Sequence, residues 1–191
     1  KNRSVNTFTQ RIQDCFRFSM NGKKPEADGE VMVALQSYIF WLATGAPVGA
    51  KLPGQGYKLL PKPPLEPSPE RGATVFAANC ALCHGAEGQG TKRADGGYQF
   101  PPVWGPNSYN WGAGMHRVNT AAGFIKANMP FGRGGTLSDQ EAWDVAAYVN
   151  SRPRPQDPRF TGDVADTRAK FHNDDDYYGV TVDGKVVGAE K

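Results

Sequence analysis

The sequence contains the pentapeptide CALCH at residues 80–84, in which two cysteines stand three positions apart and a histidine follows directly. Cys-x-x-Cys-His is the attachment pattern of a c-type haem. Cys80 and Cys83 can add to the two vinyl groups of one porphyrin, and His84 then points its imidazole at the iron. A redox dithiol or half of a zinc site is the alternative for a bare cysteine pair, but the adjacent histidine favours covalent haem.

A haem iron held by His84 takes a sixth ligand, most often methionine or histidine. The segment after the haem motif offers Met115, His116 and Met129. We favour Met129, in KANMPFG, because it comes shortly before the last helix of this half, where Pro130 would stiffen its approach.

The second ring nitrogen of His84 also needs a partner, because metal-bound histidines donate that N–H to a carbonyl or a carboxylate. The segment FPPVWG offers the carbonyl groups of Pro101 and Pro102. We expect one of these two carbonyls to orient His84, and we count Pro102 among the cofactor-binding residues.

A third cysteine, Cys15, stands alone in RIQDCFRFSMNGKK near the start of the chain. Neighbouring cations favour a thiolate and also attract a dianion, and Ser19 could donate a hydrogen bond to that anion. The alternative is a small core residue beside a solvated basic face, since free cysteines are often buried. The cations around Cys15 are Arg11, Arg17, Lys23 and Lys24.

Two helices are needed to hold the haem motif. ERGATVFAANCALCHG predicts a helix that delivers the cysteines at its C-terminal end, and LSDQEAWDVAAYVNSRP opens with a capping box and predicts a second helix. In class I cytochromes c, which this half resembles, the first and last helices cross at a small residue and an aromatic. Gly72, Phe76 and Tyr148 suit these places. The Gly- and Pro-rich segment of about 50 residues between the helices is long enough to wrap a cofactor.

The first third of the chain repeats part of this pattern. DGEVMVALQSYIFWLATG has the helical spacing of the later terminal helix, so that Tyr38 corresponds to Tyr148 and Cys15 falls near the counterpart of Met129. We predict a mainly α protein with two class I cytochrome c-like domains, of which the first is incomplete.

The expected division has four parts. They are the C-terminal part of a first cytochrome c-like domain at 1–60, a Pro-rich linker at 61–70, a complete cytochrome c domain at 71–155 and an irregular extension at 156–191. In the extension, Asp174, Asp175 and Asp176 are most simply a solvated turn.

Composition narrows the class of partner. The formal net charge is +3 and no basic run is interleaved with aromatics, which argues against nucleic acid. The most apolar window, VMVALQSYIFWLATG, falls short of the roughly 20 apolar residues that span a bilayer, so we expect no membrane span. The sequence begins at Lys1 without an initiator methionine or a signal sequence, which we interpret as a mature or truncated product.

Five motifs together resemble the diheme cytochrome c thiosulfate dehydrogenases. They are CFRFSMNGK, CALCHGAEGQG, DGGYQFPPVWG, GAGMHRVNTAAGFIKANMP and GGTLSDQEAWDVAAYV, and the resemblance extends to about residue 155. It implies oxidation of two thiosulfates to tetrathionate, or in some members the reverse reaction, with two electrons passing through two haems. It also implies a catalytic haem with a His/Cys axial pair, whose cysteine matches Cys15.

The resemblance assigns a second haem to Cys80, Cys83 and His84, with Met129 as its methionine ligand. The sequence holds one Cys-x-x-Cys-His motif, so the attachment site of the first haem would lie upstream of Lys1.

Two positions depart from the family pattern. Phe18 stands where relatives commonly carry an arginine, with Arg17 one residue earlier, and Asn128 replaces a lysine found before the methionine in some relatives. We expect the substrate residues to be Cys15, Arg11, Arg17 and Ser19.

The expected setting is the bacterial periplasm, and the expected redox partner is a soluble electron-acceptor cytochrome or a similar protein. The alternative function is an electron-transfer cytochrome c with no catalysis of its own.

Overall fold

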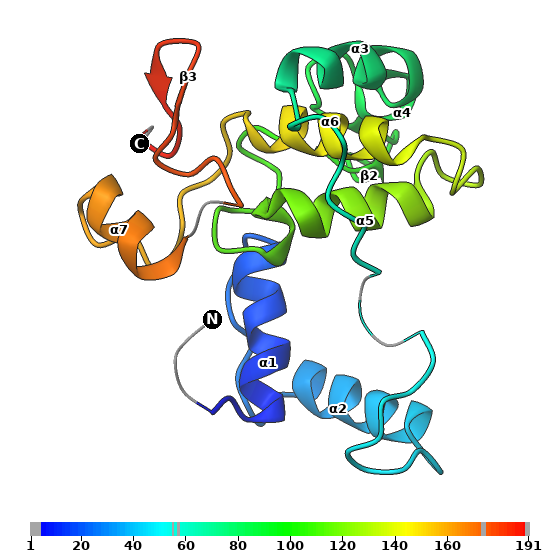
Figure 1. Cartoon of the computed structure of the whole chain (residues 1–191). Helices are drawn as coiled ribbons and strands as arrows, with labels where there is room; N and C mark the ends of the chain where they lie inside the picture. Colours follow the sequence, from blue (N-terminus) through cyan, green and yellow to red (C-terminus); the bar gives the residue numbers. More distant parts are fainter. Residues whose placement is uncertain (1–4, 55, 57, 173–174, 190–191) are drawn as a thin grey trace.

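The computed structural model describes residues 5–54, 56, 58–172 and 175–189, and the fold is mainly helical (Figure 1). The helices are α1 (Phe8–Asp14), the π-helical turn η1 (Cys15–Ser19), α2 (Glu30–Leu42), α3 (Pro69–Asn79), α4 (Ala81–His84), the 3₁₀ turn η2 (Gly114–His116), α5 (Val118–Asn128), α6 (Asp139–Asn150) and α7 (Val164–Phe171). Two antiparallel hairpins pair β1 (Thr91–Lys92) with β2 (Tyr98–Phe100) and β3 (Thr181–Val182) with β4 (Lys185–Val186). Within the described residues, no helix combines the length and the apolar character needed to cross a bilayer.

Helices α3 and α6 cross closely, as the sequence predicts. Gly72 is the point of contact, because a Cβ there would overlap the backbone carbonyl of Asp144 and lie 2.7 Å from the Cβ of Tyr148. The Phe76 and Tyr148 rings pack beside the crossing with centroids 5.5 Å apart. The capping box that begins α6 is also confirmed, since the Ser138 hydroxyl accepts the Glu141 N–H.

A buried carboxylate joins the start of α3 to the middle of α6. Asp144 accepts the backbone N–H of Ser68 at 2.8 Å, and Arg71 donates to its two oxygens from Nε at 2.8 Å and Nη2 at 2.7 Å. Such a fork fixes both distance and orientation. α3 begins at Pro69, inside the predicted linker, because Ser68 caps it and proline suits the first helical turn.

The predicted linker is held along α6. Gln140 exchanges two hydrogen bonds with the backbone of Leu65, at 3.1 and 3.2 Å, and the Trp143 indole donates to the carbonyl of Pro61 at 3.0 Å. These contacts fix the chain on its way into α3.

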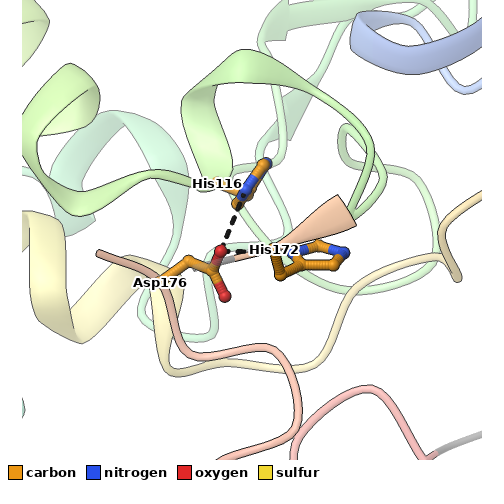
Figure 2. Close-up of side chains that lie close together, drawn as sticks. All are labelled: His116, His172 and Asp176. Carbon is orange, nitrogen blue, oxygen red and sulfur yellow. Dashed lines mark hydrogen bonds and ion pairs between the residues drawn. The ribbon is translucent and has the colours of Figure 1, made fainter. Parts of the chain in front are cut away.

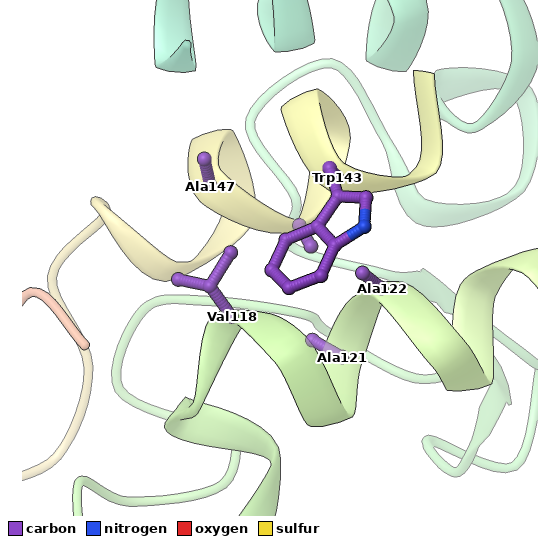
Figure 3. Close-up of a cluster of buried hydrophobic side chains, with 6 residues drawn as sticks. Val118, Ala121, Ala122, Trp143 and Ala147 are labelled. Atoms are coloured by element: carbon purple, nitrogen blue, oxygen red, sulfur yellow. The ribbon is translucent and has the colours of Figure 1, made fainter. Parts of the chain in front are cut away.

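Helix α5 lies along α6, on the side away from α3 (Figure 1). Figure 3 shows the packing, in which the Trp143 indole fills the space above small residues of α5. Helix α5 was not expected from the sequence, although its apolar residues follow helical spacing. The buried cluster comprises Val118, Ala121, Ala122, Trp143, Ala146 and Ala147.

Helix α2 forms where predicted, but most of its apolar side chains are exposed. Met32 is its buried residue, whereas Trp41 is 67% exposed and Phe40 64%. The others that lie open are Val31, Val33, Tyr38 and Leu42. The helical pattern therefore predicts α2 correctly. It does not predict what packs against the exposed apolar face of this helix.

The C-terminal extension is not irregular, which corrects the expectation for residues 156–191. It contains α7 and the β3–β4 hairpin, and the fully buried ring of Tyr178 packs edge-on against Trp111 at 5.6 Å. Asp176 is 5% exposed, so it is no solvated turn; its carboxylate is surrounded by cationic and imidazole groups. Asp175 is part-buried, and Asp174 lies outside the described residues.

Candidate functional site

The haem motif spans the end of α3 and the short helix α4. Cys80 directly follows α3 and precedes α4, and its carbonyl accepts the N–H groups of Cys83 at 3.1 Å and His84 at 2.9 Å. Neither cysteine forms a disulfide. Gly85, with φ +79°, ends the helix in a conformation that favours glycine. The two thiols and the imidazole thus leave one helical turn together, as thioether attachment and iron ligation require.

The Nδ1 of His84 lies 2.8 Å from the carbonyl oxygen of Pro101. Nδ1–H is therefore the donor, and Nε2 keeps a lone pair for a metal. This geometry corrects the choice of Pro102 as orienting residue. Gly90 donates to the carbonyl of His84 at 2.7 Å, and a Cβ at Gly90 would lie 2.5 Å from the carbonyl oxygen of Phe100, so the end of β2 lies beside the motif and Pro101 lies opposite the ring.

An aromatic cluster closes the side of the motif against α6. The Trp104 ring lies 4.9 Å from the ring of Phe76 and 5.5 Å from that of Tyr148. Burial raises the pKa of the Cys80 thiol to about 11, and neighbouring Cys83 adds to the shift. A raised pKa does not favour the thiolate that a redox dithiol uses, and the donor set of Cys80, Cys83 and the oriented His84 fits haem c.

Met129 follows α5 directly and is half-buried, with its N–H bonded to the carbonyl of Ile125 at 2.8 Å. Its role as sixth ligand stays a prediction. His116, one alternative, is 2% exposed and has its Nε2 3.2 Å from a carboxylate oxygen of Asp176, so its imidazole is engaged with the extension. Met115 is part-buried, and its carbonyl accepts from Asn150.

Cys15 lies at the junction of α1 and η1 and is exposed, so the interpretation as a core residue is wrong. Its thiol donates to the carbonyl of Arg11 at 3.5 Å, and the Arg11 guanidinium approaches the sulfur at 3.9 Å. π-Helical turns occur frequently at functional sites. The Cys15 sulfur thus has the Arg11 guanidinium beside it, and the residue is accessible to solvent.

The other predicted substrate residues are spread around η1. Arg17 donates to the carbonyl of Pro158 at 2.8 Å, so it ties η1 to the extension instead of standing beside the thiol. Lys24 pairs with Asp14 at 3.6 Å. Ser19 is exposed in the last turn of η1. Of these residues, the structure therefore brings Arg11 to Cys15 and directs Arg17 elsewhere.

The repeat in which Cys15 corresponds to Met129 stays a prediction. Cys15 is the residue that directly follows α1, and Met129 is the residue that directly follows α5. Each precedes the later helix of its half, α2 or α6.

The crossing of α3 and α6 and the Cys-x-x-Cys-His motif between them define a class I c-type cytochrome domain. In agreement, residues 67–149 match the family described as cytochrome C oxidase, cbb3-type, subunit III. The chain as a whole is similar to proteins named thiosulfate dehydrogenase.

The relatives that show this are similar over almost the whole chain. A thiosulfate dehydrogenase of Stutzerimonas stutzeri is 54% identical over 98% of the chain, and one of Thiomonas intermedia is 52% identical over 98%. The solved structure of thiosulfate dehydrogenase TsdBA from Marichromatium purpuratum is 56% identical over 99% of the chain, with a TM-score of 0.93. The chain spans 62% and 60% of the two curated relatives and 42% of the solved chain.

Sequence reasoning missed the buried cluster formed by His116, His172 and Asp176. Its members come from η2, from the end of α7 and from the segment before β3. No local spacing connects them, and the one available signal was that His172 had no role while His116 was a less favoured candidate for the sixth haem ligand.

Proposed function

We propose that the protein is a periplasmic thiosulfate dehydrogenase that joins two thiosulfates into tetrathionate at Cys15. Electrons leave through a haem at Cys80, Cys83, His84 and Met129 toward a soluble electron-acceptor cytochrome. The observation that carries the proposal is the exposed Cys15 thiol with the Arg11 guanidinium 3.9 Å from its sulfur. The names of the relatives support the choice of thiosulfate.

The residues around Cys15 suit a small dianion. A guanidinium next to the sulfur stabilises the thiolate and attracts thiosulfate to the same place. Ser19 lies exposed on the same turn and can donate a hydrogen bond to a sulfonate oxygen.

The chemistry balances in two steps. In the first, the outer sulfur of thiosulfate bonds to the Cys15 thiolate sulfur, and two electrons leave, which gives a cysteinyl S-thiosulfonate. In the second, the outer sulfur of another thiosulfate attacks the same substrate sulfur; the bond to Cys15 breaks, tetrathionate departs and the thiolate returns. Bound haem supplies one-electron acceptors for the pair of electrons.

The decisive experiment compares Cys15→Ala and Cys15→Met with the parent in the natural full-length protein. Thiosulfate-dependent reduction of an acceptor cytochrome should fall to background in both variants, because methionine can bind iron but has no thiolate. Met20→Ala, an exposed change at the end of the same turn, should keep parental turnover. If Cys15→Met oxidises thiosulfate at the parental rate, the covalent mechanism is wrong.

Haem stoichiometry separates this proposal from a pure electron carrier. A pyridine haemochrome assay beside an intact mass should give two haems per chain in the natural protein. One haem, with no turnover of thiosulfate, would favour the carrier.

A further inference from the structure

Two histidines outside the haem motif meet at one carboxylate. The chain has three histidines, and His84 is used by Cys-x-x-Cys-His. His116 Nε2 and His172 Nδ1 each lie 3.2 Å from the same oxygen, Oδ2 of Asp176 (Figure 2). The exposed fractions of these side chains are 3%, 0% and 0%.

The opposite nitrogen of each ring faces an acceptor. His116 Nδ1 contacts the carbonyl oxygen of Ala113, and His172 Nε2 lies 3.1 Å from a carboxylate oxygen of Asp157. In a neutral imidazole one nitrogen carries the proton and the other a lone pair. If the outer nitrogens donate to these acceptors, both inner nitrogens direct lone pairs at Asp176. This is the arrangement that outer acceptors impose on metal-bound histidines.

Three electron-pair donors therefore converge at one buried point. One ligand atom of each of the three residues lies within 4.8 Å of those of the other two, and the 3.2 Å contact of the buried His116 Nε2 with Asp176 lacks the geometry of a regular hydrogen bond. Three lone pairs facing one another away from water are unfavourable unless a proton or a metal cation lies between them.

We propose that His116, His172 and Asp176 bind a divalent transition-metal ion, with zinc as the first candidate. Two imidazole nitrogens and one carboxylate oxygen are a donor set that zinc accepts. This proposal is independent of the function proposed for Cys15.

The surroundings hold the donors in place. Arg159 donates to both oxygens of Asp157, at 2.9 and 2.6 Å, and so fixes the carboxylate behind His172. Arg168 lies 3.3 Å from Oδ1 of Asp176, which leaves Oδ2 toward the imidazoles. His172 also lies at the wall of a surface hollow of about 510 Å³.

The ion has a structural role in this arrangement. His116 belongs to η2 of the cytochrome domain, whereas His172 and Asp176 belong to the extension. A metal at this point fastens the extension to the domain, and because a folded site is required to bind it, binding stabilises the fold.

The first test is metal content. The full chain with its haem, produced without a histidine tag, is dialysed against metal-free buffer and analysed by mass spectrometry for metals. We expect about one zinc per chain, and X-ray absorption at the zinc edge should show only N and O ligands at about 2.0–2.1 Å. After chelation, zinc should raise the melting temperature and restore resistance of the extension to protease.

Variants make the test specific. Asp176→Asn should lower the bound zinc by at least about tenfold, as expected for loss of a charged ligand. Asp166→Asn removes an exposed carboxylate of α7 and should keep the parental zinc content. If Asp176→Asn does not fold, the proposal is judged from the parent chain, by its zinc content and by the change in its melting temperature when zinc is added.

Three results would overturn the proposal. They are a parent chain without metal whose melting temperature does not respond to zinc, equal zinc in the two variants, and sulfur ligands in the absorption spectrum. Any of them would leave the cluster as a hydrogen-bonded network of imidazoles and carboxylates.

Discussion

One hydrogen bond, between His84 and a backbone carbonyl, fixes the orientation of the histidine in the haem motif. The Pro101 carbonyl assigns the proton of His84 to Nδ1, and the iron-facing nitrogen follows from that contact. The sequence predicts that a carbonyl of FPPVWG performs this role, but the choice between adjacent prolines depends on how β2 ends, which spacing alone does not encode.

Met129 is expected to set the potential of the haem. Met129→Ala should abolish the weak near-infrared band of methionine-to-iron charge transfer and lower the reduction potential, since methionine ligation raises it. Absorption spectroscopy and a redox titration measure both. Met115→Ala is the matched control, and a band that disappears in this control but persists in Met129→Ala would transfer the assignment to Met115.

The two arginines near Cys15 should differ in function. Arg11→Ala should raise KM for thiosulfate about tenfold or more, because a hydrogen bond to a charged group contributes roughly 1.5–3 kcal/mol. Arg17 contacts Pro158, so Arg17→Ala should lower stability while changing KM much less. Steady-state kinetics of both variants, beside thermal unfolding, make the comparison. A larger rise of KM in Arg17→Ala would contradict this division.

At the scale of helices, the α3–α6 crossing depends on one missing side chain. Gly72→Ala introduces a methyl group against the Asp144 carbonyl and should destabilise the fold by about 1–3 kcal/mol, the usual cost of overpacking. Denaturant unfolding gives the difference. Thr74→Ala places alanine at an exposed position of the same helix and should cost little. If both variants unfold alike, the crossing is looser than described.

Local sequence signals explain which helices could be predicted. The helices α2, α3 and α6 carry clear spacing, and α6 also has a capping box, so each was foreseen. The apolar residues of α5 also follow helical spacing, but they lie within the Gly- and Pro-rich segment that the sequence predicts as a wrap around the cofactor; in the structure they pack against Trp143 of α6. For α2 the spacing correctly predicts a helix. The spacing does not predict which part of the protein, if any, packs on the apolar face of that helix.

Across the whole molecule, contacts between distant segments hold the parts together. The Asn110 amide donates to the carbonyl of Arg17 at 2.8 Å, and Gly112 lets the Phe18 ring approach closely. Such long-range pairs leave no trace in local spacing, and the hydrogen bond from Arg17 to the carbonyl of Pro158, which ties η1 to the extension, is another of them. Phe18, the departure from the family pattern, is thereby a buried docking residue, 2% exposed.

Tyr178 is the centre of the contact between the extension and the cytochrome domain. Its ring is fully buried, stacks on His172 at 4.1 Å and meets Trp111 at 5.6 Å, while its hydroxyl donates to the side chain of Gln156 at 2.9 Å. Removing the ring leaves a cavity, and burial of such a side chain typically contributes about 3–5 kcal/mol.

Tyr178→Ala should therefore release the extension without disturbing the haem. Limited proteolysis followed by mass spectrometry should show cleavage after about residue 155, many times faster than in the parent. The visible spectrum should not change, because the Cys80–His84 motif packs in a separate cluster around Phe76 and Val145. Tyr38→Ala, at a position 56% exposed, is the control that should leave proteolysis unchanged. Equal cleavage of parent and Tyr178→Ala would show that the extension is held elsewhere, and a simultaneous loss of the haem spectrum would show that the two clusters unfold as one unit.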